Sequence, residues 1–190
     1  QSLKFYICIV NIKAMNQKIK FAVIGQGHIG KRHAEMIRRN EGSELVAVCD
    51  ILPKEKLGLA EITEPFYISV EELLSNHPDI EVVNVCTPNG LHASQALSVL
   101  EASKHVVLEK PMALHLKDCE QLLYKALHVQ KQIFCVMQNR FSPPSYWLKQ
   151  IVSEKIIGDI FMVPLNCYWN RDDRYYKKGN WKGNQYLDGL

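Results

Sequence analysis

Gly25-Gln26-Gly27-His28-Ile29-Gly30 decides the fold, because a strand pattern precedes these six residues and a helical pattern follows them. Ile19 to Ile24 is an apolar, β-branched run of strand length. His28 to Arg39 carries apolar or small residues at helical spacing among charged ones. Glycine-rich turns are common, but one placed between a strand and a helix is the pattern of a dinucleotide-binding site.

The glycines have separate predicted tasks in such a site. Gly25 permits the tight turn, Gly27 lets the main chain approach a pyrophosphate, and Gly30 allows the helix to pack closely on the sheet. The helix N-terminus then offers N–H groups and a positive dipole end to the phosphates. The same loop includes Gln26, His28 and Ile29. The alternative interpretation is a purely structural glycine turn.

Asp50 is the expected reader of the adenosine ribose. It ends the second predicted strand, where a carboxylate can accept hydrogen bonds from the ribose hydroxyls. The same negative charge would repel a 2′-phosphate. The sequence therefore predicts NAD rather than NADP as the cofactor.

Strand and helix patterns alternate along most of the chain, which predicts an α/β fold of the Rossmann type, a doubly wound parallel sheet with right-handed crossovers. Further strands are expected at 44–50, 65–69, 82–86, 105–108 and 133–137. Further helices are expected at 70–75, 91–103 and 115–130. After Ser142-Pro143-Pro144, a helix at 145–155 and a strand at 159–168 are expected to open a second α/β domain.

Composition narrows the class of protein. The 190 residues are 47% hydrophobic and 23% charged, as in an ordinary globular protein, and the net charge of +3 is too small to indicate a nucleic-acid partner. No apolar run reaches the ~20 residues that a membrane span needs. The six cysteines are scattered without metal-type spacing, which predicts reduced thiols, no metal site and a cytoplasmic protein.

Three segments are expected along the chain. Residues 1–14 are interpreted as a non-native extension, because Met15 heads the segment that leads into the first strand; an extra edge strand is the alternative. Residues 15–142 are expected to form the NAD-binding domain. Residues 143–190 are expected to be a partial substrate domain, because ~50 residues are few for a domain of normal size. The chain is therefore expected to be cut short.

Polar motifs follow two of the later predicted strands. Thr87-Pro88-Asn89-x-x-His92 comes after one and Glu109-Lys110-Pro111 after the next. Taken singly, such a lysine is usually a surface charge and such a histidine is usually a structural residue of a helix. Both motifs lie at the carboxyl ends of strands, where sheets of this kind bind ligands, and this shared location favours a functional site.

From about Lys18 onward the sequence resembles the Gfo/Idh/MocA oxidoreductases, through four motifs in this order: Gly25-x-Gly27-x-x-Gly30-x-x-His33, Thr87-Pro88-Asn89-x-x-His92, Glu109-Lys110-Pro111 and Gln138-Asn139-Arg140-Phe141. The resemblance implies a Rossmann domain followed by a domain whose open, mainly antiparallel sheet carries the sugar site and often the homo-oligomer interface. It extends the cofactor site to Thr87, Pro88, Asn89, His92, Glu109, Lys110 and Gln138.

The resemblance also makes Lys110 the catalytic residue, beside the nicotinamide and the substrate hydroxyl. The peptide before the proline is often cis in the family, so Glu109 and Pro111 would aim Lys110 without reacting themselves. Hydride transfer from a sugar carbon leaves a hydroxyl proton that needs an acceptor. A partly desolvated lysine near a cationic nicotinamide can take that proton or donate to the developing oxyanion.

The tail from Cys167 to Gly183 resembles the subgroup that oxidises UDP-N-acetyl-2-amino-2-deoxyglucuronate at its 3-hydroxyl, a step toward surface polysaccharide. Its cations and aromatic rings could bind a diphosphate and stack on uracil. The cations are Arg171, Arg174, Lys177, Lys178 and Lys182. The substrate residues expected from the resemblance are Lys110, Arg140, Asn170, Arg171, Tyr175, Trp181 and Lys182. A solvated strand edge is the alternative, and a nucleic-acid partner is disfavoured by the small size of the cluster.

The sequence departs from the family pattern at its end. The family continues with a glycine-rich turn and a histidine that helps to deprotonate the substrate, whereas this sequence ends at Asp188-Gly189-Leu190. No histidine present is expected to replace it, since His105, His115 and His128 lie in the Rossmann half. Two other functions stay open, a dehydrogenase of a free sugar or inositol and a non-catalytic NAD-binding module.

Overall fold

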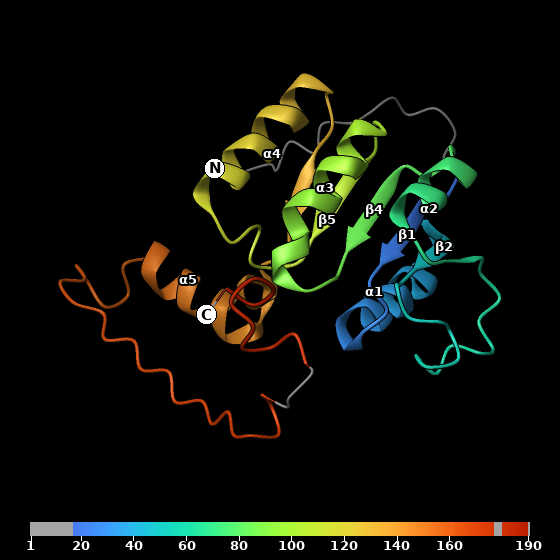
Figure 1. Ribbon diagram of the computed structural model, residues 1–190. Helices are drawn as coiled ribbons and strands as arrows, with labels where there is room; N and C mark the ends of the chain where they lie inside the picture. Colours follow the sequence, from blue (N-terminus) through green and yellow to red (C-terminus); the bar gives the residue numbers. More distant parts are fainter. Residues whose placement is uncertain (1–16, 177–179, 190) are drawn as a thin grey trace.

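A six-stranded parallel sheet is the centre of the computed structural model, which describes residues 17–176 and 180–189 (Figure 1). The strand order is β3-β2-β1-β4-β5-β6. Successive strands are added on one side of β1 up to β3 and on its other side from β4 onward. This is the order of a doubly wound dinucleotide fold, which binds ligands where the order reverses, between β1 and β4. The strands are β1 (Ile19–Ile24), β2 (Ser43–Cys49), β3 (Phe66–Tyr67), β4 (Val82–Val85), β5 (His105–Leu108) and β6 (Ile133–Cys135).

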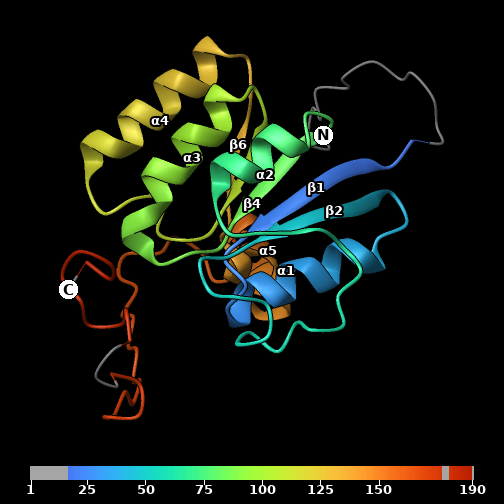
Figure 2. The same cartoon turned by 45° about the vertical axis from the view of Figure 1, so that its right-hand side comes forward.

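Helices cover both faces of the sheet. One helix, α1, packs over β1 and β2, while α2, α3 and α4 lie side by side on the opposite face (Figure 2). The helices are α1 (His28–Arg39), α2 (Val70–Asn76), α3 (His92–Glu101), α4 (Leu116–His128) and α5 (Pro143–Ser153), with the short 3-10 helices η1 (Asn89–Leu91) and η2 (Gln138–Phe141). The larger core lies between the sheet and α2–α4, and a smaller one lies under α1.

The central strands are buried because they have neighbours on every side. In β1, Ala22 pairs with Ala47 of β2 and with Val83 of β4, and all three side chains are fully buried. Near-continuous apolar runs are what a strand covered on both faces requires. The one polar exception in β4 is Asn84, which is also buried.

The predicted elements are confirmed with one exception. β1, α1 and β5 occupy the predicted residues, and most other boundaries differ by one or two residues. The prediction of a strand at 159–168 was wrong, because these residues are irregular and exposed. A strand is stable only when a neighbour pairs with its main-chain groups, and no strand of the described ranges lies beside it. The open antiparallel sheet is therefore not formed by these residues.

Parts of two predictions fall outside the described residues. The expected extension at 1–14 and the proposed start at Met15 lie there, as do Lys177 and Lys178 of the basic tail. Within residues 17–176 and 180–189, no helix has the length and apolarity needed to cross a membrane. The five cysteines in these ranges are free, and burial raises the pKa of Cys49 to about 12.

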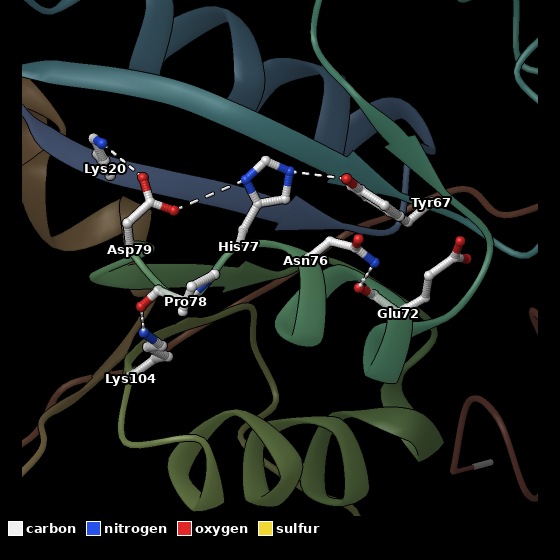
Figure 3. A network of polar contacts seen from close by, with 8 residues as sticks. All are labelled: Lys20, Tyr67, Glu72, Asn76, His77, Pro78, Asp79 and Lys104. Carbon is white, nitrogen blue, oxygen red and sulfur yellow. Dashed lines mark hydrogen bonds and ion pairs between the residues drawn. The ribbon is translucent and has the colours of Figure 1, made fainter.

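A polar network at the opposite edge from the glycine loop fixes the segment that leads from α2 into β4 (Figure 3). The ammonium of Lys20 lies 2.6 Å from a carboxylate oxygen of Asp79, which raises the pKa of the lysine and lowers that of the aspartate. The hydroxyl of Tyr67 lies 3.0 Å from Nε2 of His77. The ammonium of Lys104 donates to the carbonyl oxygen of Pro78 in the same segment. The segment is thus tied to β1, β3 and the start of β5.

Two leucines of α4 test this account of the core. Leu122 is fully buried against the sheet, whereas Leu127 is 79% exposed. We expect Leu122→Ala to lower the free energy of unfolding by ~2–5 kcal/mol, because it leaves a cavity. Leu127→Ala, the matched control, should change it by less than ~0.5 kcal/mol. Urea denaturation followed by circular dichroism measures both, and equal effects would contradict the assigned packing.

Candidate cofactor site

The glycine loop joins β1 to α1 through two positions that admit only glycine. Gly25 has a φ of +86°, and a Cβ there would lie 2.7 Å from the carbonyl oxygen of Cys86. A Cβ on Gly30 would lie 1.7 Å from the carbonyl oxygen of Gly25. The tight turn and the close helix packing predicted for these residues are therefore confirmed.

Gly27 differs from the other two glycines, because a Cβ there would meet nothing within 4 Å. It is the N-cap of α1 and supplies no side-chain cap. The N–H of Lys31 donates to its carbonyl at 3.1 Å, so the N–H groups of His28, Ile29 and Gly30 precede the first helical hydrogen bond. His28 and Ile29 are exposed. Open space beside free N–H groups at a positive helix end fits a pyrophosphate.

Asp50 lies against the glycine loop, as the sequence predicts. Its Oδ2 accepts the N–H of Gln26 at 2.6 Å, and its Oδ1 accepts the N–H of Leu52 at 2.9 Å. The carboxylate is therefore held where a ribose beside the loop would meet it. The side chain of Gln26 points away, since it is buried and donates to the carbonyl of Val23 at 3.1 Å. Gln26 thus contributes to this edge through its main chain, whose N–H binds Asp50.

His92 is buried between the two later motifs. Its ring is 1% exposed, with Nδ1 2.7 Å from the carbonyl oxygen of Pro111 and Nε2 2.9 Å from that of Thr87. The hydroxyl of Thr87 in turn donates to the amide oxygen of Gln95 at 2.6 Å. The ring of His92 therefore joins the loop after β4 to the loop after β5.

Glu109 and Lys110 follow β5 at the same edge. Glu109 is 7% exposed, and its Oε2 accepts the N–H of Lys110 at 3.2 Å. Burial alone raises the pKa of Glu109, but the hydrogen bond from His33 together with the N–H and charge of Lys110 holds it below its usual value. The Lys110–Pro111 peptide is cis, as the resemblance implied. The side chain of Lys110 is exposed, so the described residues alone do not supply the partial desolvation expected for it.

The tail returns to the cofactor edge. The side-chain amide of Asn89 donates to the carbonyl and the carboxylate of Asp188, at 3.1 and 3.2 Å. The N–H of Gly90 donates to the carbonyl of Leu187 at 2.9 Å, and a Cβ on Gly90 would lie 1.9 Å from the carbonyl oxygen of Tyr186. Residues 186–188 therefore lie directly on η1, beside a cavity of about 210 Å³.

Several expected substrate residues of the tail gather in one cluster. Arg171 lies over the rings of Trp169 and Tyr175, at 5.3 and 4.7 Å from their centroids. The ammonium of Lys182 lies 3.9 Å from the centre of the Tyr175 ring. Such contacts hold cations over aromatic faces. The structure thus brings Arg171, Tyr175 and Lys182 together.

Other expected residues stand apart from this cluster. Gln138 and Arg140 lie exposed in η2, which follows β6 at the carboxyl edge of the sheet. Asn170 is exposed in the irregular segment, and Trp181 is partly buried in the tail. Within the described ranges, no group of three or more His, Cys, Asp or Glu side chains could hold a metal ion.

Sequence analysis missed three contacts at this edge. His33 was noted only as the last residue of the glycine motif, yet its ring forms hydrogen bonds with both Glu109 and Asn84. The signal for Asn84 was an amide within an otherwise apolar strand. Asp188 carried no signal, because its partner Asn89 lies 99 residues away.

Comparison with known proteins gives the family. A family model described as "Oxidoreductase family, NAD-binding Rossmann fold" matches residues 19–137. The chain belongs to the Gfo/Idh/MocA family of oxidoreductases. The matched segment includes the glycine loop, the Thr87 and Lys110 motifs and every strand of the sheet. The domain is therefore an NAD-binding Rossmann domain.

Solved and curated relatives extend the comparison. The WlbA dehydrogenase from Chromobacterium violaceum, solved with NADH and UDP-GlcNAcA, is 34% identical with a TM-score of 0.86, covering 95% of this chain and 52% of its own. Myo-inositol 2-dehydrogenase of Thermotoga maritima is 30% identical over 74% of this chain and 42% of its own length. Alpha-N-acetylgalactosaminidase of Shewanella oneidensis is 26% identical over 86% and 39%. The chain thus spans about four-tenths of these curated relatives and half of the solved one.

The glycine loop yields a paired prediction. We expect Gly27→Ala to keep the fold but to weaken NADH binding at least about tenfold, because the added methyl group enters the space assigned to the pyrophosphate. Gly30→Ala should instead unfold or strongly destabilise the domain, since its Cβ would overlap the Gly25 carbonyl. NADH fluorescence titration and thermal denaturation separate the two effects. Native NADH affinity in folded Gly27→Ala would exclude this placement of the pyrophosphate.

Proposed function

We propose that this chain is the cofactor-binding part of an NAD-dependent dehydrogenase that oxidises the 3-hydroxyl of UDP-N-acetyl-2-amino-2-deoxyglucuronate. One observation carries the proposal. The glycine loop, Asp50 and Lys110 lie at one edge of the sheet, and the tail that bears Arg171 and Lys182 docks on this edge through Asn89. A dinucleotide and a sugar nucleotide could therefore meet beside Lys110.

The cofactor would lie across the carboxyl ends of the strands. In this proposal the N-terminus of α1 binds the pyrophosphate and Asp50 accepts hydrogen bonds from the adenosine ribose. The loops after β4 and β5 would flank the nicotinamide half, held together by His92. Thr87, Pro88, Asn89, Glu109 and Gln138 complete the proposed cofactor site.

The proposed reaction divides between cofactor and protein. NAD, when bound, would supply the acceptor for the hydride of the sugar carbon. The hydroxyl proton would leave as the carbonyl forms, and Lys110 would take it as a free amine, so that the alcohol becomes a ketone and the lysine an ammonium. The buried carboxylate of Glu109 accepts the N–H of Lys110 and so orients the start of its side chain.

The basic and aromatic tail supports a sugar nucleotide as substrate. Arg171 and Lys182, both held over the ring of Tyr175, can neutralise a diphosphate, and the exposed ring of Trp169 can stack on a uracil. The WlbA relative was solved with UDP-GlcNAcA, a sugar nucleotide of this class. We include Lys110, Arg140, Asn170 and Trp181 in the proposed substrate site. A dehydrogenase of inositol or a free sugar is the second candidate, favoured by the myo-inositol 2-dehydrogenase relative.

The same proposal divides the chain. Residues 15–142 are the NAD-binding domain, and residues 143–190 belong to a second domain that contributes to the substrate site. The absence of a paired strand at 159–168 is consistent with a sheet that needs further strands. In the family, such sheets often carry a homo-oligomer interface.

Asp50 gives the first test. We expect the chain to bind NADH more tightly than NADPH, because the Asp50 carboxylate would repel the 2′-phosphate. Asp50→Asn should narrow this preference, since the amide loses the charge; its one oxygen can still accept the Gln26 N–H, while the bond from the Leu52 N–H is lost. Glu55→Gln, an exposed neighbour, should leave it unchanged. Fluorescence titration measures the NADH and NADPH affinities of the native chain and both variants. An unchanged preference for NADH in Asp50→Asn would exclude Asp50 as the reader of the ribose.

Lys110 gives the second test. In a full-length protein that contains this chain, we expect Lys110→Ala to keep NADH affinity within a few-fold while lowering turnover by at least ~100-fold, the usual effect of losing a general base. Lys117→Ala, an exposed lysine of α4, is the control. NADH formation is followed with UDP-N-acetyl-2-amino-2-deoxyglucuronate and, in parallel, with myo-inositol. Unchanged turnover would exclude Lys110 from the reaction, and turnover of inositol alone would favour the second candidate.

A further inference from the structure

A chain of hydrogen bonds connects the middle of the sheet to Lys110. The side-chain nitrogen of Asn84 in β4 lies 2.9 Å from Nδ1 of His33 in α1. Nε2 of His33 lies 3.0 Å from Oε1 of Glu109, and Oε2 of Glu109 accepts the N–H of Lys110 at 3.2 Å. These four residues thus form one hydrogen-bonded chain from β4 through α1 to the loop after β5.

We propose that His33 is a positioning residue, which holds the carboxylate of Glu109 and, through it, the main chain of Lys110 in the orientation that the reaction requires. This inference rests on the role proposed for Lys110. It adds a residue of the glycine-loop helix to the machinery around the reacting sugar.

The first bond sets the hydrogen on the His33 ring. The amide nitrogen of Asn84 can only donate, so Nδ1 of His33 accepts. A neutral ring then carries its hydrogen on Nε2, which faces Glu109 and donates to the carboxylate. Asn84 therefore selects the one neutral tautomer that can hold Glu109.

Packing alone would not favour an asparagine at position 84. Asn84 is 5% exposed in the apolar strand β4, and its Oδ1 has no hydrogen-bond partner among the described residues. A buried oxygen without a partner destabilises a fold, and a valine would fit the strand pattern. Departures of this kind from the local pattern are expected where a residue serves a site.

The ionisation of Glu109 depends on the same contacts. The titratable groups that act on it are His33 and Lys110, and it acts in turn on the thiols of Cys86 and Cys135. Because the folded state lowers the pKa of Glu109, its stabilising contribution is present above the ordinary glutamate pKa and is lost as pH falls through the lowered value. Loss of the His33 donor leaves only the N–H and charge of Lys110 to oppose the effect of burial, so the pKa of Glu109 should rise.

Three variants test the inference on the chain itself. His33→Leu removes the donor, whereas His33→Gln places an amide N–H near the position of Nε2. Met36→Leu is the control, because Met36 lies one turn further along α1 and lines the same cavity of about 400 Å³ as His33, a cavity that Glu109 does not line. Carboxyl-carbon NMR follows the titration of Glu109, and hydrogen exchange follows the Lys110 amide.

We expect His33→Leu to raise the pKa of Glu109 and to speed exchange of the Lys110 amide about tenfold, as loss of a hydrogen bond does. His33→Gln should restore both toward native values, and Met36→Leu should change neither. In a turnover assay of a full-length protein that contains this chain, His33→Leu should lower kcat with little change in the KM for NAD, and His33→Gln should recover it. A native Glu109 titration, a native Lys110 exchange rate or a native kcat in folded His33→Leu overturns the inference.

A measurement on the unaltered chain covers the case in which His33→Leu does not fold. Nitrogen-15 NMR of the ring should show the hydrogen on Nε2, and a hydrogen on Nδ1 alone overturns the inference. The proposed function fails separately: a chain that binds no NADH, yet shows the Nε2 hydrogen and the His33→Leu effect on Lys110, contradicts the dehydrogenase and leaves the positioning of Lys110 by His33 standing.

Discussion

The close approach of Gly30 to the carbonyl of Gly25 is the constraint on which the rest of the site depends. Because no side chain separates them, α1 can begin directly at the end of β1. This contact directs the N–H groups of the first turn toward the carboxyl edge, and it places His33 about one and a half turns inside that edge. The pyrophosphate site and the contact to Glu109 are thus two consequences of one close packing.

Polar side chains connect elements that the apolar core leaves free to shift. Hydrophobic contacts hold the helices on the sheet, but they have little directional preference. His92 joins the loops after β4 and β5, and Glu109 joins α1 to Lys110. Hydrogen bonds of buried groups have strict geometry, so they fix the relative orientation of loops that packing alone would leave variable.

The tail is held by contacts other than the packing of α1 on the sheet. Its aromatic and cationic side chains form a cluster around Tyr175, and its last described residues lie on η1. Residues 159–168 nevertheless remain irregular, because their main-chain groups have no adjacent strand to pair with. A strand is a property of a sheet, so a sequence pattern alone cannot form one.

The sequence by itself determined the order and type of β1 to α5, the roles of Gly25 and Gly30, and the family, since these depend on local periodicity and on short motifs. It also predicted Asp50 beside the glycine loop, because parallel strands end at one edge. Only the tertiary structure decided that Asn84, His33 and Glu109 form a chain and that Asp188 holds Asn89. Those contacts join residues 51 to 99 positions apart, and no local pattern encodes distances set by the packing of a helix on a sheet.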